Sequence, residues 1–259
     1  MNTIALLTDF GLKDNFVGVM KGVCLCINPR AALIDITHAI RPQGIKEAGF
    51  LLAQSFRFFP KGCVFLVVVD PGVGSARKAI AIKTKNYYFV GPDNGVLSAA
   101  AGLDGIKRTV SLSNRKYFLK DISRTFHGRD IFAPVAGHLS KGLAIERLGK
   151  AQAKIKEVKM PRVKIEKGRL QGEVVYIDRF GNMVTNITKK QLQGFTKKRK
   201  FRAIIRSKRI EKMYSFYEQA GSKELFLCEG GFGLLEVSLR QRSAAAFLRA
   251  KAGDKIIVT

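Results

Sequence analysis

The feature that most constrains the fold is an apolar run that ends abruptly in an acid, a proline and two glycines. Residues 63–69 are all apolar, and the loop Asp70-Pro71-Gly72-Val73-Gly74-Ser75-Ala76-Arg77 follows them directly. A short apolar run bounded by turn residues predicts a buried strand. Because open α/β sheets bind ligands beyond the carboxyl ends of their strands, Asp70 lies where a site would form. Arg77 can face Asp70 across the loop, so the stretch fits either a structural salt bridge or a functional pair.

Strand and helix patterns alternate around this run. Strands are predicted at residues 4–8, 32–36 and 63–69. The segments between them place apolar residues at helical spacing and predict helices over 16–27 and 45–58, the first capped by Asp14. A β-α-β-α-β order favours parallel strands joined by right-handed crossovers.

The second part of the chain has a different pattern. Before it, we predict a hairpin at 79–90, a strand at 106–112 and helices at 96–101 and 131–139. Residues 151–168 are basic, contain Pro161 and are typical of a linker. Strand patterns dominate afterwards, at 170–177, 183–187, 201–205, 225–228, 234–237 and 256–258. We therefore predict an N-terminal α/β domain with a mainly parallel sheet over 1–150 and a smaller all-β domain over 169–259.

The net charge is the unusual feature of the composition. The chain carries 46 basic and 20 acidic residues, a formal net charge of +26. Such a charge attracts polyanions. However, the densest basic cluster, residues 197–200, has no interleaved aromatic residues for base stacking, and no nucleic-acid-binding motif is present. We interpret most of the charge as solvated surface, which leaves nonspecific adhesion to RNA or DNA as an open alternative.

The cysteines and the N-terminus bear on the cellular compartment. None of the four cysteines forms a Cys-x-x-Cys pair, and their apolar neighbours predict reduced core thiols in a cytoplasmic protein, without a disulfide framework or a zinc site. The N-terminal segment lacks the basic region of a signal peptide and predicts a strand. No apolar run reaches the roughly 18 residues of a membrane-spanning helix, so no membrane partner is expected.

Three predicted loops carry groups that suit chemistry on water. These groups follow the first and third strands or precede the last helix of the first domain: Asp9, Asp70, Arg77 and His127. A histidine near an acid and an arginine can be held in the geometry and protonation state that water activation needs.

Other kinds of site are not predicted. The remaining histidines, His38 and His138, are interpreted as structural, because one follows a strand end and the other lies in an apolar helix. No local group of His, Asp or Glu has metal-ligand spacing. The chain also lacks the P-loop and the Gly-x-Ser-x-Gly elbow, which excludes P-loop nucleotidases and hydrolases of the nucleophile-elbow type.

A series of short motifs resembles one enzyme family. The motifs are, in chain order, Thr8-Asp9-Phe10-Gly11, Lys21-Gly22, Asp35-Ile36-Thr37-His38, the 70–77 loop, Gly91-Pro92-Asp93-Asn94-Gly95, Thr125-Phe126-His127-Gly128-Arg129-Asp130, Ile177-Asp178-Arg179-Phe180-Gly181-Asn182, Thr185-Asn186 and Gly233-Leu234-Leu235-Glu236. In this order they resemble the S-adenosylmethionine (SAM) hydroxide adenosyltransferases, or SAM hydrolases, which are related to SAM-dependent fluorinases and chlorinases. The resemblance spans nearly the whole chain.

The resemblance implies a fold, an assembly and a reaction. The fold is an N-terminal α/β domain followed by a C-terminal β-barrel. The assembly is a homotrimer whose SAM site lies between the N-terminal domain of one subunit and the C-terminal domain of the next. The reaction is attack of water or hydroxide on the ribose C5′, which gives adenosine and L-methionine. SAM is then the substrate, and no separate cofactor or metal is implied.

Three residues match the family's catalytic set, namely Asp70, Arg77 and His127. They would bind and polarise the attacking water, and which of them takes the proton stays open. Because methionine leaves as a neutral thioether, the enzyme must supply mainly an activated nucleophile in line with the carbon. Halogenases lack this Asp and His, since a bound halide needs few anionic neighbours, and they carry an insertion where this chain has the short turn 83–86.

Six residues match substrate-binding positions. The positions that contact the ribose and the base in the first domain are Asp9, Thr125 and Phe126. Asp9 would accept hydrogen bonds from the ribose hydroxyls through its two oxygens. Asp178 matches the carboxylate that faces the methionine ammonium, whereas Phe180 and Asn182 match groups that pack against the adenine and bond its edge. From residue type alone, Asp178 also fits a turn residue and Phe180 a core residue.

One departure from the family pattern concerns the methionine end of the substrate. Relatives commonly carry an Asn-Ser pair where this chain has Gly230-Gly231, so a serine hydroxyl for the methionine carboxylate is missing at Gly231. Backbone amides of the glycines, or positive charge nearby, would have to replace it. A non-catalytic SAM- or adenosine-binding protein is therefore the alternative, and a SAM-dependent halogenase is a weaker one.

Overall fold

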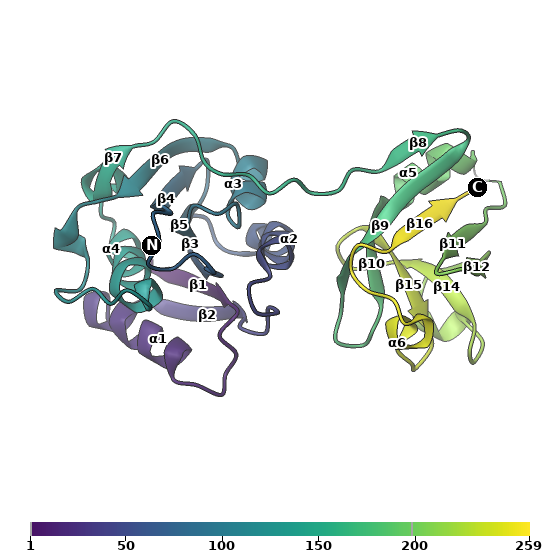
Figure 1. Ribbon diagram of the computed structural model, residues 1–259, viewed down its shortest axis with the longest axis horizontal. Coiled ribbons are helices and arrows are strands. Elements are labelled where there is room, and N and C mark those ends of the chain that lie inside the picture. The colour runs from purple at the N-terminus through teal and green to yellow at the C-terminus, as the bar shows by residue number, and fades with distance from the viewer. Residues whose placement is uncertain (1, 198) are drawn as a thin grey trace. The chain divides into compact units, whose positions relative to one another are not determined.

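The chain folds into two compact units. The structure, a computed structural model, describes residues 2–197 and 199–259. The first unit spans Met1–Met160 and the second spans Pro161–Thr259 (Figure 1). Each unit has its own sheet and its own apolar core.

The first unit is built on a 7-stranded sheet with the order β2-β1-β3-β5-β4-β6-β7. Its strands are β1 (Thr3–Thr8), β2 (Ala32–Thr37), β3 (Val64–Val68), β4 (Ala79–Thr84), β5 (Tyr88–Pro92), β6 (Ile106–Leu112) and β7 (Gly149–Ala151). The pairs β1–β2, β1–β3 and β3–β5 are parallel, whereas β4–β5, β4–β6 and β6–β7 are antiparallel. The prediction of a mainly parallel sheet is therefore wrong for its second half. The short connection between β4 and β5 is the reason, because a parallel pair needs a longer crossover.

Helices cover both faces of this sheet. They are α1 (Phe16–Ile27), α2 (Ile45–Ser55), α3 (Ser98–Asp104) and α4 (Ala133–Ser140), with short turns η1 (Phe56–Phe58), η2 (Arg115–Tyr117), η3 (Gly128–Phe132) and η4 (Ile145–Leu148). Successive side chains of a strand point to opposite faces. Accordingly, Ile4 and Leu6 of β1 pack in the core that includes residues of α1 and α4, and Ala5 and Leu7 pack in the core that includes residues of α2 and α3.

The starts and ends of two helices differ from the predicted ones. Helix α1 is preceded by Asn15, which has helical φ and ψ of −78° and −1° and makes no side-chain capping bond. The predicted cap at Asp14 is therefore wrong, because Asn15 occupies the capping position and Asp14 lies one residue before it. The predicted helix at 131–139 begins earlier, in the π-helical turn η3 that leads into α4.

The second unit is a curled sheet of 9 strands with the order β12-β11-β16-β9-β10-β15-β14-β13, and β8 pairs with β9 (Figure 1). The strands are β8 (Lys164–Glu166), β9 (Arg169–Ile177), β10 (Met183–Thr188), β11 (Ala203–Ile205), β12 (Lys208–Ile210), β13 (Met213–Tyr214), β14 (Leu225–Glu229), β15 (Leu234–Leu239) and β16 (Lys255–Val258). Among the described residues, β12 and β13 form the two ends of this sheet and do not pair with each other. The expected barrel is thus present as a curled sheet.

The second unit also contains helices, so the expectation of an all-β domain is wrong in detail. They are α5 (Lys189–Thr196), α6 (Ala244–Leu248) and the turn η5 (Tyr217–Gln219). Thr188 and Gln191 cap α5 reciprocally through side chain and backbone. A Thr followed three residues later by Gln is a local signal for a helix start, so this helix was detectable in the sequence.

The segment predicted as a linker, residues 151–168, contains regular structure at both ends. Ala151 is the last residue of β7, and the three residues of β8 pair with β9. Between them, the buried carboxylate of Asp93 accepts hydrogen bonds from Lys156 N (2.7 Å) and Gln152 Nε2 (3.0 Å). These bonds fix the start of the segment to the turn that follows β5.

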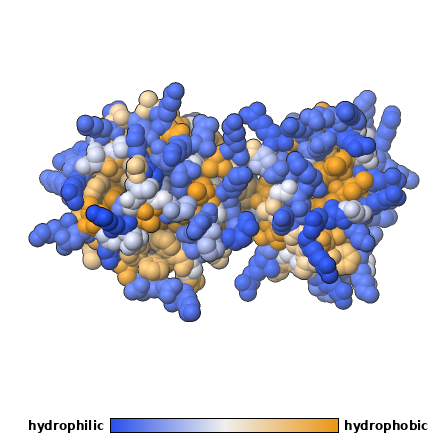
Figure 2. Space-filling view, viewed as in Figure 1, coloured by the Kyte–Doolittle hydropathy of each residue, from blue (hydrophilic) through white to orange (hydrophobic). Residues whose placement is uncertain are grey.

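Surface and thiol properties follow the composition in most respects. Hydrophilic side chains spread over the visible face of each unit without gathering in one place (Figure 2).

Burial raises the pKa of the Cys24 and Cys63 thiols to about 12, which makes both unreactive. Cys228 is also buried, but Cys26 is exposed, so the core prediction is wrong for Cys26. In the part of the chain that the structure describes, no helix has the length and apolarity to cross a membrane.

Candidate functional site

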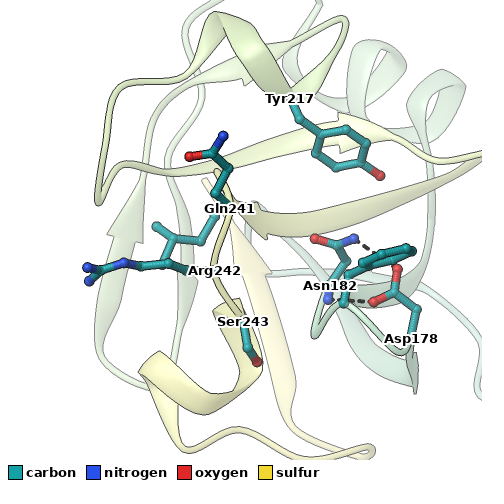
Figure 3. A pocket seen from close by; sticks show the side chains of 8 residues that line it. Asp178, Asn182, Tyr217, Gln241, Arg242 and Ser243 are labelled. Atoms are coloured by element: carbon teal, nitrogen blue, oxygen red, sulfur yellow. Dashed lines mark hydrogen bonds between the residues drawn. The ribbon is translucent and has the colours of Figure 1, made fainter.

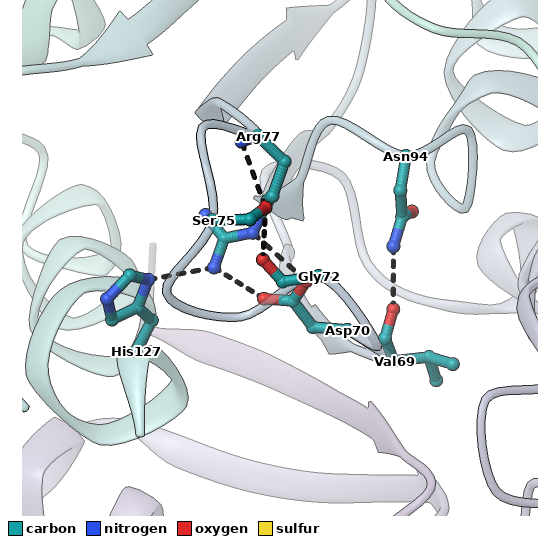
Figure 4. A network of polar contacts seen from close by, with 7 residues as sticks. All are labelled: Val69, Asp70, Gly72, Ser75, Arg77, Asn94 and His127. Atoms are coloured by element: carbon teal, nitrogen blue, oxygen red, sulfur yellow. Dashed lines mark hydrogen bonds and ion pairs between the residues drawn. The ribbon is translucent and has the colours of Figure 1, made fainter. Parts of the chain in front are cut away.

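An acid and an arginine form the centre of the site in the first unit. Asp70 comes two residues after the end of β3, at the carboxyl edge of the sheet. Arg77 Nε donates to Asp70 Oδ1 at 3.0 Å, and Nη2 donates to Oδ2 at 2.5 Å (Figure 4). The two side chains are only 7% and 5% exposed. The predicted pairing is confirmed, and its fork geometry is the stronger kind of charged hydrogen bond.

The loop between these two residues is fixed by its own hydrogen bonds. Ser75 Oγ donates to the carbonyl of Gly72 at 2.7 Å and accepts from the backbone of Arg77 at 3.2 Å. Gly74 has φ +77°, and a Cβ there would collide with the carbonyl oxygen of Arg124. Only glycine combines that backbone with so close an approach. The loop is thereby packed against the segment that carries the site's histidine.

His127 completes the network. It precedes the π-helical turn η3, and Arg77 Nη2 lies 2.8 Å from His127 Nδ1 (Figure 4). A guanidinium can only donate, so Nδ1 accepts and the ring of a neutral His127 carries its proton on Nε2. Burial lowers the pKa of His127, as does the charge of Arg77, while Asp70 and Asp130 oppose the shift. The arrangement therefore favours the neutral imidazole.

A buried acid that the sequence analysis gave no role holds the loop around His127. Asp130 is fully buried and accepts from Ser123 N at 2.8 Å and from Arg129 Nε at 2.6 Å. The Arg129 guanidinium in turn lies 5.2 Å from the centre of the Phe126 ring. Asp130 thus links the start of the loop to its aromatic residue. Its only signal in the sequence was its place in the polar motif after His127.

The end of β3 is also tied to the next turn of the sheet. Asn94 Nδ2 donates to the carbonyl of Val69 at 2.8 Å, and Asn94 Oδ1 accepts from Val96 N at 3.1 Å (Figure 4). This amide bridge fixes the backbone immediately before Asp70. The Gly-Pro-Asp-Asn-Gly motif therefore has a structural role at the site that sequence reasoning did not assign.

Asp9 leaves the same edge of the sheet as Asp70. Thr8 of β1 pairs in parallel register with Val68 of β3, so the acids that follow the two strands emerge together. Asp9 Oδ2 accepts from Gln43 N at 2.8 Å, and its side chain keeps partial exposure. One carboxylate oxygen is thereby positioned while the group stays accessible.

A second network of polar contacts contains His38 and includes Thr8, the residue before Asp9. The buried His38 ring bonds Thr8 Oγ1 through Nδ1 at 2.8 Å, and its Nε2 lies 2.9 Å from Asp35 Oδ1. Lys21 Nζ lies 2.6 Å from Asp35 Oδ2. Burial acts to raise the pKa of Asp35, but the bonds from Lys21 and His38 outweigh it and the pKa is lowered. The structural interpretation of His38 agrees with this position.

Phe126 lies in a cluster of three aromatic rings. Its ring centre is 6.0 Å from that of Phe10 and 5.2 Å from that of Phe16, both in edge-on contacts. Because Phe10 follows Asp9 directly, the cluster joins the loop after β1 to the loop of His127. Thr125 is exposed beside it and donates its backbone N–H to Ser123 Oγ at 3.1 Å. The predicted residues of the first unit thus converge on one edge of its sheet.

The predicted residues of the second unit line one pocket of about 570 Å³ (Figure 3). The lining side chains are Asp178, Phe180, Asn182, Tyr217, Leu239, Gln241, Arg242 and Ser243. Asp178 Oδ1 accepts from Asn182 N, and Oδ2 accepts from Asn182 Nδ2, both at 2.8 Å. Gly181 N donates to the Asp178 carbonyl at 3.0 Å, so Asp178 is a turn residue as well as a pocket residue.

Two aromatic rings line this pocket. Phe180 is 78% exposed, so its interpretation as a core residue is wrong. Tyr217, in η5, was missed by sequence reasoning because it belongs to none of the motifs. Asn182 is buried and its amide is fixed by Asp178, which orders a polar group next to exposed apolar rings. An apolar pocket with a few ordered polar groups is the usual form of a small-molecule site.

The two glycines that depart from the family pattern differ in their surroundings. A Cβ at Gly230 would collide with the carboxyl group of Glu236, whereas a Cβ at Gly231 would have open space around it. A side chain at position 230 would therefore displace the Glu236 carboxyl group, whereas a side chain at position 231 would meet no neighbour. Concerning metals, the described residues contain no group of three or more His, Cys, Asp or Glu side chains arranged to hold an ion.

Comparisons with known proteins agree with this arrangement. The family profiles described as SAM hydroxide adenosyltransferase N-terminal and C-terminal domains match residues 4–149 and 172–257. An (R)-S-adenosyl-L-methionine hydrolase of Salinispora tropica is 36% identical, over 99% of this chain and 97% of the relative. The crystal structure of an uncharacterized conserved protein from Thermotoga maritima superposes with a TM-score of 0.93 at 40% identity, covering 98% of this chain and 99% of that one.

A more distant relative is a fluorinase, from the related group of enzymes that the motifs also indicate. A fluorinase of an Actinoplanes species is 27% identical and covers only 73% of either chain. The hydrolases match over nearly the full length at higher identity, and both family profiles match in order. The resemblance inferred from the motifs is confirmed, and this chain belongs to the SAM hydroxide adenosyltransferase family.

Proposed function

We propose that this chain hydrolyses SAM to adenosine and L-methionine. The observation that carries the proposal is the hydrogen-bonded network of Asp70, Arg77 and His127, in which the buried acid–arginine pair orders a partly buried, neutral imidazole at the carboxyl edge of the sheet. The full-length similarity to proteins named (R)-S-adenosyl-L-methionine hydrolase supports the same reaction and the R configuration at sulfur.

The reaction is a displacement at C5′ of the ribose. A bond forms between the water oxygen and C5′, the C5′–S bond breaks, and its electron pair passes to sulfur. Methionine leaves as a neutral thioether, and the attacking water loses one proton, which is released to solvent. Since the leaving group needs no acid, the contribution expected of the protein is to hold a polarised water in line with the C5′–S bond.

The network suits that task in its observed state. Both oxygens of Asp70 accept from Arg77 and retain further lone pairs, which can accept a hydrogen bond from water. Neutral His127 has a proton on Nε2 and can donate to the water oxygen or to a developing hydroxide. Arg77 fixes both groups and is itself held 5.3 Å from the centre of the Phe132 ring. A site ordered before substrate binds avoids reorganisation during the reaction.

The remaining predicted residues would bind the substrate. Asp9 would accept from the ribose hydroxyls, and Thr125 and Phe126 would line the ribose and the base. Asp178 would face the methionine ammonium, with Phe180 and Asn182 at the adenine. This division needs residues from both units. It is satisfied in a homotrimer whose sites lie between subunits, which we include in the proposal together with a cytoplasmic location.

The proposed assembly would cover apolar side chains that are exposed on each unit. Leu12 and Phe58 in the first unit and Phe180 and Phe247 in the second are all at least half exposed. Apolar residues of this size mark interaction sites when they gather on a surface. Size measurement in solution by light scattering tests the trimer, and a monomeric mass would contradict it.

The proposal is tested by incubating the purified chain with SAM of each sulfur configuration and separating the products by chromatography. Adenosine and methionine in equal amounts from the R form are expected. Intact SAM that nevertheless binds in calorimetry would establish the alternative of a non-catalytic binding protein. Formation of a 5′-halogenated adenosine in the presence of halide would establish the halogenase alternative instead.

A further inference from the structure

A buried carboxyl group beside the pocket of the second unit has no part in the reaction proposed above. Glu236 lies on β15 and is 6% exposed. The hydroxyl of Tyr217 donates to Glu236 Oε2 at 3.0 Å. A buried carboxyl group is costly unless it is hydrogen-bonded, so this contact is the partner that stabilises it.

The backbone at Gly230 makes room for this carboxyl group. An added Cβ at Gly230 would collide with Glu236 Oε1 and Cδ and lie 2.9 Å from its Cγ. The backbone there is fixed, because Gly230 N donates to Leu234 O at 2.9 Å and Gly233 N donates to Gly230 O at 2.9 Å. With the turn between β14 and β15 held by these bonds, a side chain at residue 230 would displace the Glu236 carboxyl group from its position.

Tyr217 connects Glu236 to the pocket. Its ring lines the pocket together with Asp178 and Asn182 (Figure 3). The ring also meets Phe226 edge-on, with centres 6.2 Å apart. The turn η5 that holds it has only three residues, and the hydroxyl contacts with Glu236 and with the Cys228 thiol restrain the ring.

Burial and neighbouring acidic groups raise the pKa of both members of this pair. Burial raises the pKa of Glu236, and the charge of Asp178 adds to this, while the bond from Tyr217 acts in the opposite direction. Burial also raises the pKa of Tyr217, helped by Glu236, Cys228 and Asp178. The Tyr217 hydroxyl can donate to either form of the carboxyl group, so the contact persists over a wide pH range.

We propose that Glu236 is a positioning residue that holds the Tyr217 ring as a wall of the pocket, where it packs against the adenine of the substrate. Gly230 contributes to this positioning, because the absence of a side chain at residue 230 leaves room for the Glu236 carboxyl group. The inference rests on the proposed function for the identity of the ligand. It assigns a role in substrate specificity to Tyr217, Glu236 and Gly230, which act together through the Tyr217 ring.

The experiment compares Tyr217→Phe, Glu236→Leu and Gly230→Ala with the unmodified chain. Each removes or displaces the same hydrogen bond, so each is expected to raise KM for SAM and Kd for adenosine about fivefold to tenfold, with kcat little changed. Glu236→Gln keeps an oxygen that accepts from Tyr217 and is expected to restore values near those of the unmodified chain. Adenosine binding is measured by calorimetry and melting temperature by circular dichroism.

A second tyrosine–glutamate pair in the same unit provides the matched control. Tyr214 OH donates to Glu224 Oε2 at 2.9 Å, and its ring also contacts Phe226, but it does not line the pocket. Tyr214→Phe is expected to leave KM and Kd unchanged. Equal effects of Tyr214→Phe and Tyr217→Phe would show a merely structural role and overturn the proposal.

Further outcomes separate this proposal from the proposed function. Unchanged adenosine affinity in a folded Tyr217→Phe variant would overturn the positioning role even if SAM is hydrolysed. An unmodified chain that binds adenosine without hydrolysing SAM would contradict the proposed function, and the affinities of the variants would still decide the role of Glu236. Failure of the unmodified chain to bind SAM or adenosine would overturn both.

Discussion

The site in the first unit and the pocket in the second hold their side chains in opposite ways. Asp70 and Arg77 are almost fully buried and bonded to each other, whereas Phe180 is largely exposed at the rim of its pocket. The first arrangement costs desolvation of charges, which is tolerable only because the pair is fully hydrogen-bonded. The second leaves apolar area that a ligand or a second subunit can bury. The comparison suggests that the first unit performs the chemistry and the second supplies affinity.

The largest effect is expected from removing the imidazole. His127→Ala should lower kcat for SAM hydrolysis by about 10²–10⁴-fold with little change in KM, because it deletes the group that polarises the water. Steady-state formation of adenosine measures both constants. His138→Ala is the control, since His138 packs edge-on against Tyr117 at 5.1 Å and has no contact with the network. A His127→Ala variant that keeps full kcat would contradict the assignment of the chemistry to the first unit.

The next effect concerns pH. Burial and Arg77 lower the pKa of His127 from 6.5, so the neutral form should predominate at pH 7. Protonation on Nδ1 would break the bond from Arg77, so kcat should stay level above pH 6.5 and fall by about tenfold per pH unit below the lowered pKa. Because the unfolded chain binds this proton more readily, the free energy of unfolding should also fall as the pH drops below 6.5. An acid limb above pH 6.5 in the kcat profile would contradict the neutral assignment.

A smaller effect is expected in the pocket of the second unit. Phe180→Ala should raise KM for SAM by about threefold to tenfold and leave kcat nearly unchanged, because the ring contributes packing and no chemistry. Phe247→Ala is the matched control, since Phe247 is 50% exposed in the same unit but does not line the pocket. A fall in kcat without a change in KM would break the division between chemistry and affinity.

The smallest effect should be confined to stability. Thr188→Ala removes the reciprocal cap of α5, outside both sites, and should lower the free energy of unfolding by about 1 kcal/mol. Kinetic constants should stay the same. Ser243→Ala removes the cap of α6 but also changes a residue that lines the pocket, so it should lower stability similarly and raise KM as well. Chemical denaturation gives the first quantity and steady-state kinetics the second.

Much of the site in the first unit was predictable because it depends on strand ends. Asp9 and Asp70 follow strands that pair directly, and parallel strands bring their carboxyl ends to one edge. The contact from Arg77 to His127 was not predictable from residue pattern, since it joins positions 50 residues apart. It depends on the packing of Gly74 against Arg124, which is a tertiary contact. The family resemblance supplied this grouping where local patterns did not.

The fold was least predictable where short elements depend on distant partners. Strands β12 and β13 have three and two residues and acquire their conformation from pairing, so they leave little pattern in the sequence. Tyr217 belongs to a similarly short turn, which explains why it was missed. Glu236 stood in a recognised motif, but its function depends on Gly230 and Tyr217, whose contacts only the tertiary structure reveals.

The central claim is that water ordered by the Asp70, Arg77 and His127 network attacks the ribose carbon. Hydrolysis of SAM in heavy-oxygen water, followed by mass spectrometry of the products, tests it most directly. The account predicts that the heavy oxygen appears in the 5′-hydroxyl of adenosine and that methionine stays unlabelled. Unlabelled adenosine, or SAM that remains intact under these conditions, would contradict it.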